Sequence, residues 1–231
     1  MAESVTRAAC QQTASARATR GCDHVSRPTT EPSPRPIWHR GSMTDAIITA
    51  LAVLAVAGQA VVAAALLVGA LAAAGVRRPL EVVRGALWGY ELWAGFLVAA
   101  IGTGGSLFLS DIAGFFPCEL CWFQRVCMYP LSIILLLAAV RNDYRVTRYL
   151  LPLPLAGAGV AVYHLLVENG IVGQSTACRL SAPGGCTTKW IEELGYVTIP
   201  ILALTGFLLL IALLGLAAAG SDEHRQEEST R

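Results

Sequence analysis

The sequence predicts an all-helical protein that spans a membrane. Of its 231 residues, 55% are apolar and only 14% are charged, and the mean hydropathy is +0.56, a balance that argues against a soluble fold. Five apolar stretches are each long enough to cross the hydrocarbon layer, which takes about 20 helical residues. They cover residues 46–75, 86–109, 121–140, 149–168 and 199–219. The formal net charge of +1, without a basic cluster, argues against nucleic-acid binding.

The first apolar stretch has Thr49 and Gln59 as its clearly polar members. It is about twice as long as the apolar part of a usual signal peptide. Its removal after export would also invert the later spans and place the Cys118–Cys121 segment in the cytoplasm. We therefore predict that residues 46–76 form a retained membrane helix.

The residues before this helix have a different character. Residues 1–45 are polar and rich in Thr, Pro and Arg, a composition typical of disorder. If residues 76–85 lie in the cytoplasm, the residues before the first span lie outside, and their arginines would have to cross the membrane. Segments rich in Arg usually stay in the cytoplasm. A start at Met43 removes the conflict, so we expect a disordered or non-native tail here.

The later spans carry recognisable boundary signals. In the second span, Glu91 lies near one surface, where we expect it to snorkel or to pair. Pro117 precedes the third span and is positioned to open its helix. Pro152 and Pro154 fall in the first turn of the fourth span, where a missing N–H costs little.

The arginines indicate how the chain is oriented. Residues 76–85 and 141–148 carry Arg repeatedly, whereas residues 110–117 carry none and residues 169–198 carry few basic side chains. Because loops rich in Arg and Lys stay in the cytoplasm, both close cysteine pairs are expected on the extracytoplasmic side of a cell membrane. Residues 220–231 then form a cytoplasmic tail.

The first cysteine pair lies at the mouth of the third span. Cys118 and Cys121 are three residues apart and share one helical face, and a helix N-terminus lowers the pKa of a thiol. This arrangement suits a redox-active dithiol, although metal sites share the spacing. Arg125 follows one turn deeper, where it is either a functional partner or a side chain that snorkels to the headgroups. Cys127 faces away from the pair and is expected to pack in the core.

The second pair lies in the loop of residues 169–198. Cys178 and Cys186 are separated by a segment with Pro183 followed by two glycines, a turn that makes a disulfide geometrically easy. Such a disulfide is either redox-active or a structural staple. A third reading joins these two cysteines with Cys118 and Cys121 in a four-cysteine zinc site.

Three segments resemble the disulfide bond formation protein B family, especially its BdbC-type branch. They are residues 105–130, GSLFLSDIAGFFPCELCWFQRVCMYP, the dipeptide Tyr163-His164, and residues 195–200, GYVTIP. The resemblance implies a four-helix transmembrane bundle over residues 86–219 with a redox loop at 169–198. The span at 46–76 is then one extra N-terminal transmembrane helix.

The resemblance also implies a membrane thiol oxidase. Electrons pass from a DsbA-like thioredoxin-fold partner to the loop pair, then to the dithiol, and from Cys121 to a quinone drawn from the membrane pool, either menaquinone or ubiquinone. No metal is implied. The residues that match the family's site are four catalytic cysteines and two quinone-binding side chains: Cys118, Cys121, Cys178 and Cys186, with Arg125 and His164. The match at His164 is looser, and a helix-packing role suits it equally.

Two other functions fit parts of the pattern. A vitamin K epoxide reductase-like protein also pairs loop cysteines with a helix-mouth dithiol, but there the loop pair comes first in the chain. A membrane adaptor with a structural disulfide is the non-enzymatic alternative. It gives no reason for Arg125 to lie below the dithiol.

Overall fold

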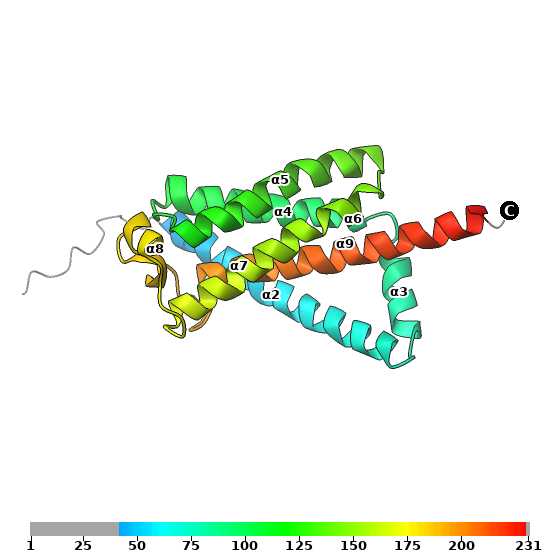
Figure 1. Cartoon of the computed structure of the whole chain (residues 1–231), viewed down its shortest axis with the longest axis horizontal. Helices are drawn as coiled ribbons and strands as arrows, with labels where there is room; N and C mark the ends of the chain where they lie inside the picture. The colour runs from blue at the N-terminus through cyan, green and yellow to red at the C-terminus, as the bar shows by residue number, and fades with distance from the viewer. Residues whose placement is uncertain (1–41, 230–231) are drawn as a thin grey trace, which may run out of the picture. The chain divides into compact units, whose positions relative to one another are not determined.

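The computed structural model describes residues 42–229, with side chains from 43 to 219 (Figure 1). Within these residues the regular elements are helical, and an isolated antiparallel bridge joins Glu193 to Val197. Of the expected tail of residues 1–45, residues 1–41 lie outside the described part, whereas residues 42–45 belong to the first turn of helix α2. The elements are α2 Ser42–Ala73, α3 Arg78–Leu87, α4 Glu91–Leu107, a π-helical turn Phe108–Ile112, α5 Glu119–Arg141, α6 Val146–Leu150, α7 Pro152–Glu168, α8 Thr176–Ser181, a 3-10 turn Gly185–Thr187 and α9 Ile199–Ser229.

Five helical segments are long and apolar enough to span a membrane. They are Met43–Ala73, Glu91–Ile112, Glu119–Arg141, Val146–Glu168 and Ile199–Ala219. The prediction of an all-helical, multi-pass membrane protein is confirmed. The fourth span consists of α6 and α7, which meet at Leu151, and its proline-containing first turn lies at the start of α7 as expected.

Helices α4, α5, α7 and α9 form the bundle, and α2 packs along α9 (Figure 1). Leu131, Leu135, Phe207 and Leu210 are fully buried between these helices, where dispersion contacts hold the bundle together. Cys127 belongs to the same core, as the helical spacing predicts.

One close approach sets the distance between α7 and α9. A Cβ atom at Gly157 would collide with the ring of Phe207, which is fully buried. Small residues at membrane helix interfaces allow such approach and increase the van der Waals contact. The Phe207 ring of α9 can therefore pack against α7 only because residue 157 has no side chain.

The segment between the first two spans differs from its prediction. The expected loop at 76–85 is instead the helix α3, none of whose residues is buried, and the second span begins at Glu91 rather than at residue 86. Its apolar and charged residues separate onto two faces, a pattern typical of helices that lie at the membrane–water interface. A turn through Gly89, with φ of +82°, separates α3 from α4.

One of the two expectations for Glu91, that it snorkels to the surface, is wrong. Its side chain is 6% exposed, so it does not snorkel to the surface, and one carboxylate oxygen, Oε2, has no hydrogen-bond partner among the described residues. The bundle packs around the start of α4 closely enough to cover this carboxylate.

The contact at Gly157 predicts a measurable loss of stability. Gly157→Ala should destabilise the folded protein by about 1–3 kcal/mol, because the added methyl group overpacks against Phe207. The measurement is thermal unfolding in detergent. Gly159→Ala is the matched control, since a Cβ at that position meets nothing within 4 Å and the gain in helix propensity is the same. Equal stability of the two variants would contradict the prediction.

Candidate functional site

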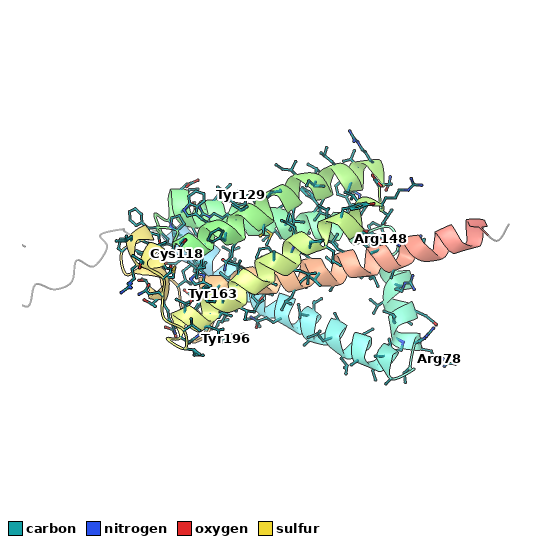
Figure 2. All side chains as sticks on the ribbon, in the orientation of Figure 1. Arg78, Cys118, Tyr129, Arg148, Tyr163 and Tyr196 are labelled. Atoms are coloured by element: carbon teal, nitrogen blue, oxygen red, sulfur yellow. A yellow bond between two sulfur atoms is a disulfide. The ribbon has the colours of Figure 1, made fainter. Side chains whose placement is uncertain are left out.

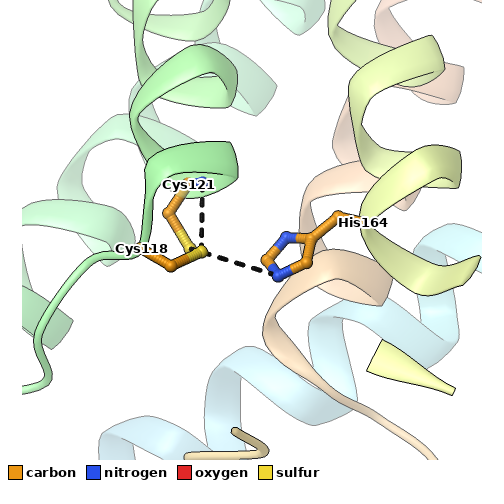
Figure 3. A group of neighbouring side chains, drawn as sticks. All are labelled: Cys118, Cys121 and His164. Atoms are coloured by element: carbon orange, nitrogen blue, oxygen red, sulfur yellow. Dashed lines mark hydrogen bonds between the residues drawn. The ribbon is translucent and has the colours of Figure 1, made fainter. Parts of the chain in front are cut away.

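The dithiol is built on the first turn of α5. Cys118 is the N-cap residue, in extended conformation, and its Sγ accepts a hydrogen bond from the backbone N–H of Cys121 at 3.4 Å. The two Sγ atoms lie 2.9 Å apart and both cysteines are free (Figure 3). A thiol at this position meets the unpaired N–H groups and the positive end of the helix dipole.

His164 of α7 faces this turn (Figure 3). Its Nε2 lies 3.6 Å from Cys118 Sγ, and its Nδ1 lies 3.4 Å from Gln124 Nε2. When the Gln124 amide donates to Nδ1, the ring proton resides on Nε2 and points toward the sulfur. The imidazole is therefore oriented to donate a hydrogen bond to a Cys118 thiolate.

These contacts change the acidity of Cys118. The hydrogen bond from the Cys121 thiol lowers the pKa of Cys118 well below its usual range. Burial opposes the shift, whereas the hydrogen bond with His164 adds to it. Cys118 is thus the more acidic thiol of the pair, and the thiolate is the reactive form in disulfide exchange.

Arg125 is tied to the neighbouring helix. Its Nε donates to Ser106 Oγ at 2.9 Å and its Nη2 donates to the Ser106 carbonyl oxygen at 3.0 Å. The guanidinium also lies 5.2 Å from the centre of the Trp122 ring, within cation–π range. The half-buried side chain is therefore held against α4, one turn below Cys121.

The loop cysteines form a disulfide. Cys178 in α8 is bonded to Cys186, and both are almost fully buried, at 2% and 1% exposed. The turn between them runs through Gly184 and Gly185, with φ of +81° and +69°, as the sequence predicts. A Cβ at Gly185 would collide with Gln174 Oε1, so the tight turn requires glycine.

The loop is docked on the start of α5. The backbone N–H of Glu119 donates to Ser181 Oγ at 3.0 Å, and Ser175 Oγ donates to the Glu119 carboxylate at 3.2 Å. As a result, Cys178 and Cys186 share one hydrophobic cluster with Cys118. The two cysteine pairs, 57 residues or more apart in sequence, are neighbours in the fold.

A cavity of about 280 Å³ opens beside the dithiol. Most of its lining is apolar and comes from α2, α4, α5 and α9. Its polar or sulfur-bearing lining includes six site residues: Cys118, Cys121, Gln124, Arg125, His164 and Cys186. This is the composition expected for a site that holds a largely apolar ligand by a few polar groups.

The structure brings together the dithiol, Arg125, His164 and Cys186 around this cavity, whereas Cys178 is not part of its lining. Sequence reasoning missed Gln124, Ser106 and Glu168, which also line it. Gln124 and Glu168 each carry a polar group inside or at the end of an apolar span, which is a signal in itself. Ser106 gave no such signal.

The arrangement of possible metal ligands differs from the zinc alternative. Cys118, Cys121 and His164 place their ligand atoms within 4.8 Å of one another. These are soft donors that suit Zn²⁺ when the dithiol is reduced. The loop cysteines are bonded to each other, so they do not complete a four-cysteine set.

A multi-pass helical bundle with a helix-mouth dithiol and a loop disulfide is typical of membrane thiol–disulfide oxidoreductases. The model of the family "Disulfide bond formation protein DsbB" matches residues 90–217. The chain belongs to this disulfide bond formation family, as the resemblance in the sequence predicts.

Curated relatives agree with this assignment. The chain is 41% identical over 134 residues to disulfide bond formation protein C of Bacillus subtilis (strain 168), covering 57% of this chain and 95% of the relative. It is 42% identical over 131 residues to a probable disulfide formation protein of Deinococcus radiodurans, covering 54% and 86%. No solved structure matches the chain significantly. The family match begins at residue 90, so α2 and α3 lie outside it.

The hydrogen bond from His164 predicts a shift in thiol titration. A folded-state pKa below the usual range keeps Cys118 ionised as the pH falls, and His164→Ala should move its titration upward by roughly one pH unit. The measurement is thiolate absorbance at 240 nm of the fully reduced protein, with Cys118→Ser as the baseline. Tyr163→Phe, next to His164 and 41% exposed, is the control. An unchanged titration in His164→Ala would contradict the assigned contact.

Proposed function

We propose that this protein is a quinone-dependent thiol oxidase that reoxidises a DsbA-like, thioredoxin-fold partner and so supports extracytoplasmic disulfide formation. The observation that carries the proposal is the single cavity whose lining includes the Cys118–Cys121 dithiol, Cys186 of the loop disulfide, Arg125 and His164. An adaptor with a structural disulfide needs no such cavity beside its cysteines.

The ends of the bundle support the proposed orientation. Figure 2 shows Arg78 and Arg148 at the end opposite to Cys118. Arginine-rich ends remain in the cytoplasm, so the dithiol and the redox loop face outward. Disulfides persist on that side of a membrane.

The first step is exchange between the partner and the loop. A partner thiolate attacks Cys178, breaking its bond to Cys186 and forming a mixed disulfide. The second partner thiol then resolves this bond, which leaves the partner oxidised and the loop pair reduced. Because Cys178 is 2% exposed, this step requires the loop to open. Leu180, two residues after Cys178 in α8, is 81% exposed and offers an apolar contact to a partner.

The second step moves the electrons inward. A thiolate of Cys186 attacks the Cys118–Cys121 disulfide, and the loop disulfide re-forms as the dithiol is reduced. Two electrons move in each exchange, and the number of disulfides is unchanged. The low pKa of Cys118 makes it a good leaving group, and the Nε2–H of His164 can donate a hydrogen bond to the departing thiolate.

The cavity fits a quinone in shape and chemistry. A quinone held here would supply the electron acceptor, taking two electrons and two protons as Cys118 and Cys121 return to the disulfide. The apolar walls suit the ring and its isoprenoid tail, and Arg125 lies within the lining beside Cys121. Two of the five guanidinium donor positions are used on Ser106, so others remain for a quinone oxygen on which negative charge develops.

Arg125→Ala should slow quinone reduction about 100-fold, the usual loss for one donor to a developing oxyanion. Exchange between the partner and the loop should stay unchanged, because it does not use the guanidinium. The measurement is the anaerobic absorbance change of an added quinone, driven by reduced partner. Arg125→Lys keeps the positive charge but loses the planar guanidinium, so its rate of quinone reduction should lie between those of the wild type and Arg125→Ala. A normal rate in Arg125→Ala would remove this residue from the quinone site.

Cys186→Ser should trap the partner on Cys178. Because Cys178 is a free thiol in this variant, the partner is supplied without its resolving cysteine and with thionitrobenzoate bonded to the remaining one. The Cys178 thiolate attacks that partner sulfur and displaces thionitrobenzoate, and the mixed disulfide, which has no internal escape, should accumulate as a partner-sized mass shift on non-reducing gels. Cys178→Ser should give much less adduct. Equal adducts from both variants would reject the order of attack. Absence of adducts, with normal activity in both variants, would show that the loop disulfide is a structural staple.

A further inference from the structure

Helix α2 lies outside the family match but borders the cavity. Leu51, Leu54 and Ala55 of α2 are among the residues that line it. The family model begins at residue 90, so these three side chains are additions to the four-helix core.

The packing of α2 is concentrated beside the cavity. Ile48, Ala52 and Ala55 are at most 7% exposed, whereas Leu66 and Leu67, farther along the helix, are 69% and 62% exposed. In Figure 1, α2 diverges from α9 toward its C-terminal end, where α3 follows. The half of α2 that touches the bundle is therefore the half that lines the cavity.

Leu51 lies close to the part of the cavity that Arg125 lines. A Cβ atom at Gly105 would lie 3.3 Å from Leu51 Cδ2, so this leucine packs directly on the α4 backbone where that helix has no side chain. The next residue, Ser106, is the one that anchors the Arg125 guanidinium. Leu51 thus forms the wall beside the Arg125 anchor.

Two further residues of α2, Gly58 and Gln59, fix its position in the bundle. At Gly58 a Cβ atom would lie 2.9 Å from Thr205 Cγ2, which shows a close approach to α9. Gln59 Oε1 accepts a hydrogen bond from Tyr196 at 2.8 Å, and its Nε2 lies 3.5 Å from Thr205 Oγ1. A polar side chain in an apolar span is costly unless it is paired, and here it pairs with both α9 and the redox loop.

We propose that α2 is a quinone-binding wall which this chain adds to the family core, with Leu51 and Leu54 in contact with the bound quinone and contributing to its affinity. This inference rests on the quinone function proposed above. It assigns binding residues outside the segment that the family shares.

The direct test is photolabelling of the purified full chain. The probe is a short-chain menaquinone analogue that carries an aryl azide, and labelled residues are located by peptide mass spectrometry. We expect saturable labelling within residues 47–58. Labelling confined to α4, α5, α7 and α9 would overturn the role of α2 and leave the quinone function standing. No saturable labelling anywhere would overturn the quinone function, and this inference with it.

A second measurement tests the contribution to affinity. Gly58→Leu should push α2 away from Thr205 and raise the dissociation constant of the unlabelled menaquinone analogue about tenfold, measured by quenching of tryptophan fluorescence. Gly69→Leu is the matched control in the same helix, because a Cβ there meets nothing within 4 Å. Leu51→Ala should weaken binding similarly without displacing the helix, so the test does not depend on one variant folding. Unchanged dissociation constants in both Gly58→Leu and Leu51→Ala would overturn the proposal.

Discussion

The unpaired N–H groups at the start of α5 are the feature on which the site depends. The N–H of Cys121 is satisfied by Cys118 Sγ, and that of Glu119 by Ser181 Oγ of the redox loop. The same helix end therefore stabilises the Cys118 thiolate and positions the loop that carries the second cysteine pair. Both pairs meet in one hydrophobic cluster because one set of backbone donors must be paired at this end of the bundle.

The cavity beside this helix end needs walls that approach closely without closing it. At three glycines a side chain of a neighbouring helix packs against the backbone: Phe207 against Gly157, Leu51 against Gly105, and Thr205 against Gly58. Each lets two membrane helices come near one another where the hydrophobic effect offers little driving force for association. The bundle thus combines tight packing at its core with an apolar cavity next to Cys118 and Cys121.

Several features followed from the sequence because they depend on local chemistry. Five spans could be counted from hydropathy alone, and the close Pro-Gly-Gly turn predicted the Cys178–Cys186 disulfide. The sequence-based predictions were wrong for an amphipathic segment, α3, and for a buried polar residue, Glu91. Hydropathy does not distinguish α3, at the start of a span, from a loop, and it does not show that Glu91 is covered by neighbouring helices.

The sequence by itself determined the class of the protein, the number of spans and the positions of the two close cysteine pairs, because apolar length, helix-mouth dithiols and turn chemistry are local properties. Only the tertiary structure decided which side chains surround those cysteines. His164 reaches Cys118 from another helix, Ser106 anchors Arg125 from a third, and α2 supplies Leu51. Such contacts arise from the packing of helices against one another, and the spacing of residues within one span does not encode which neighbour that span will meet.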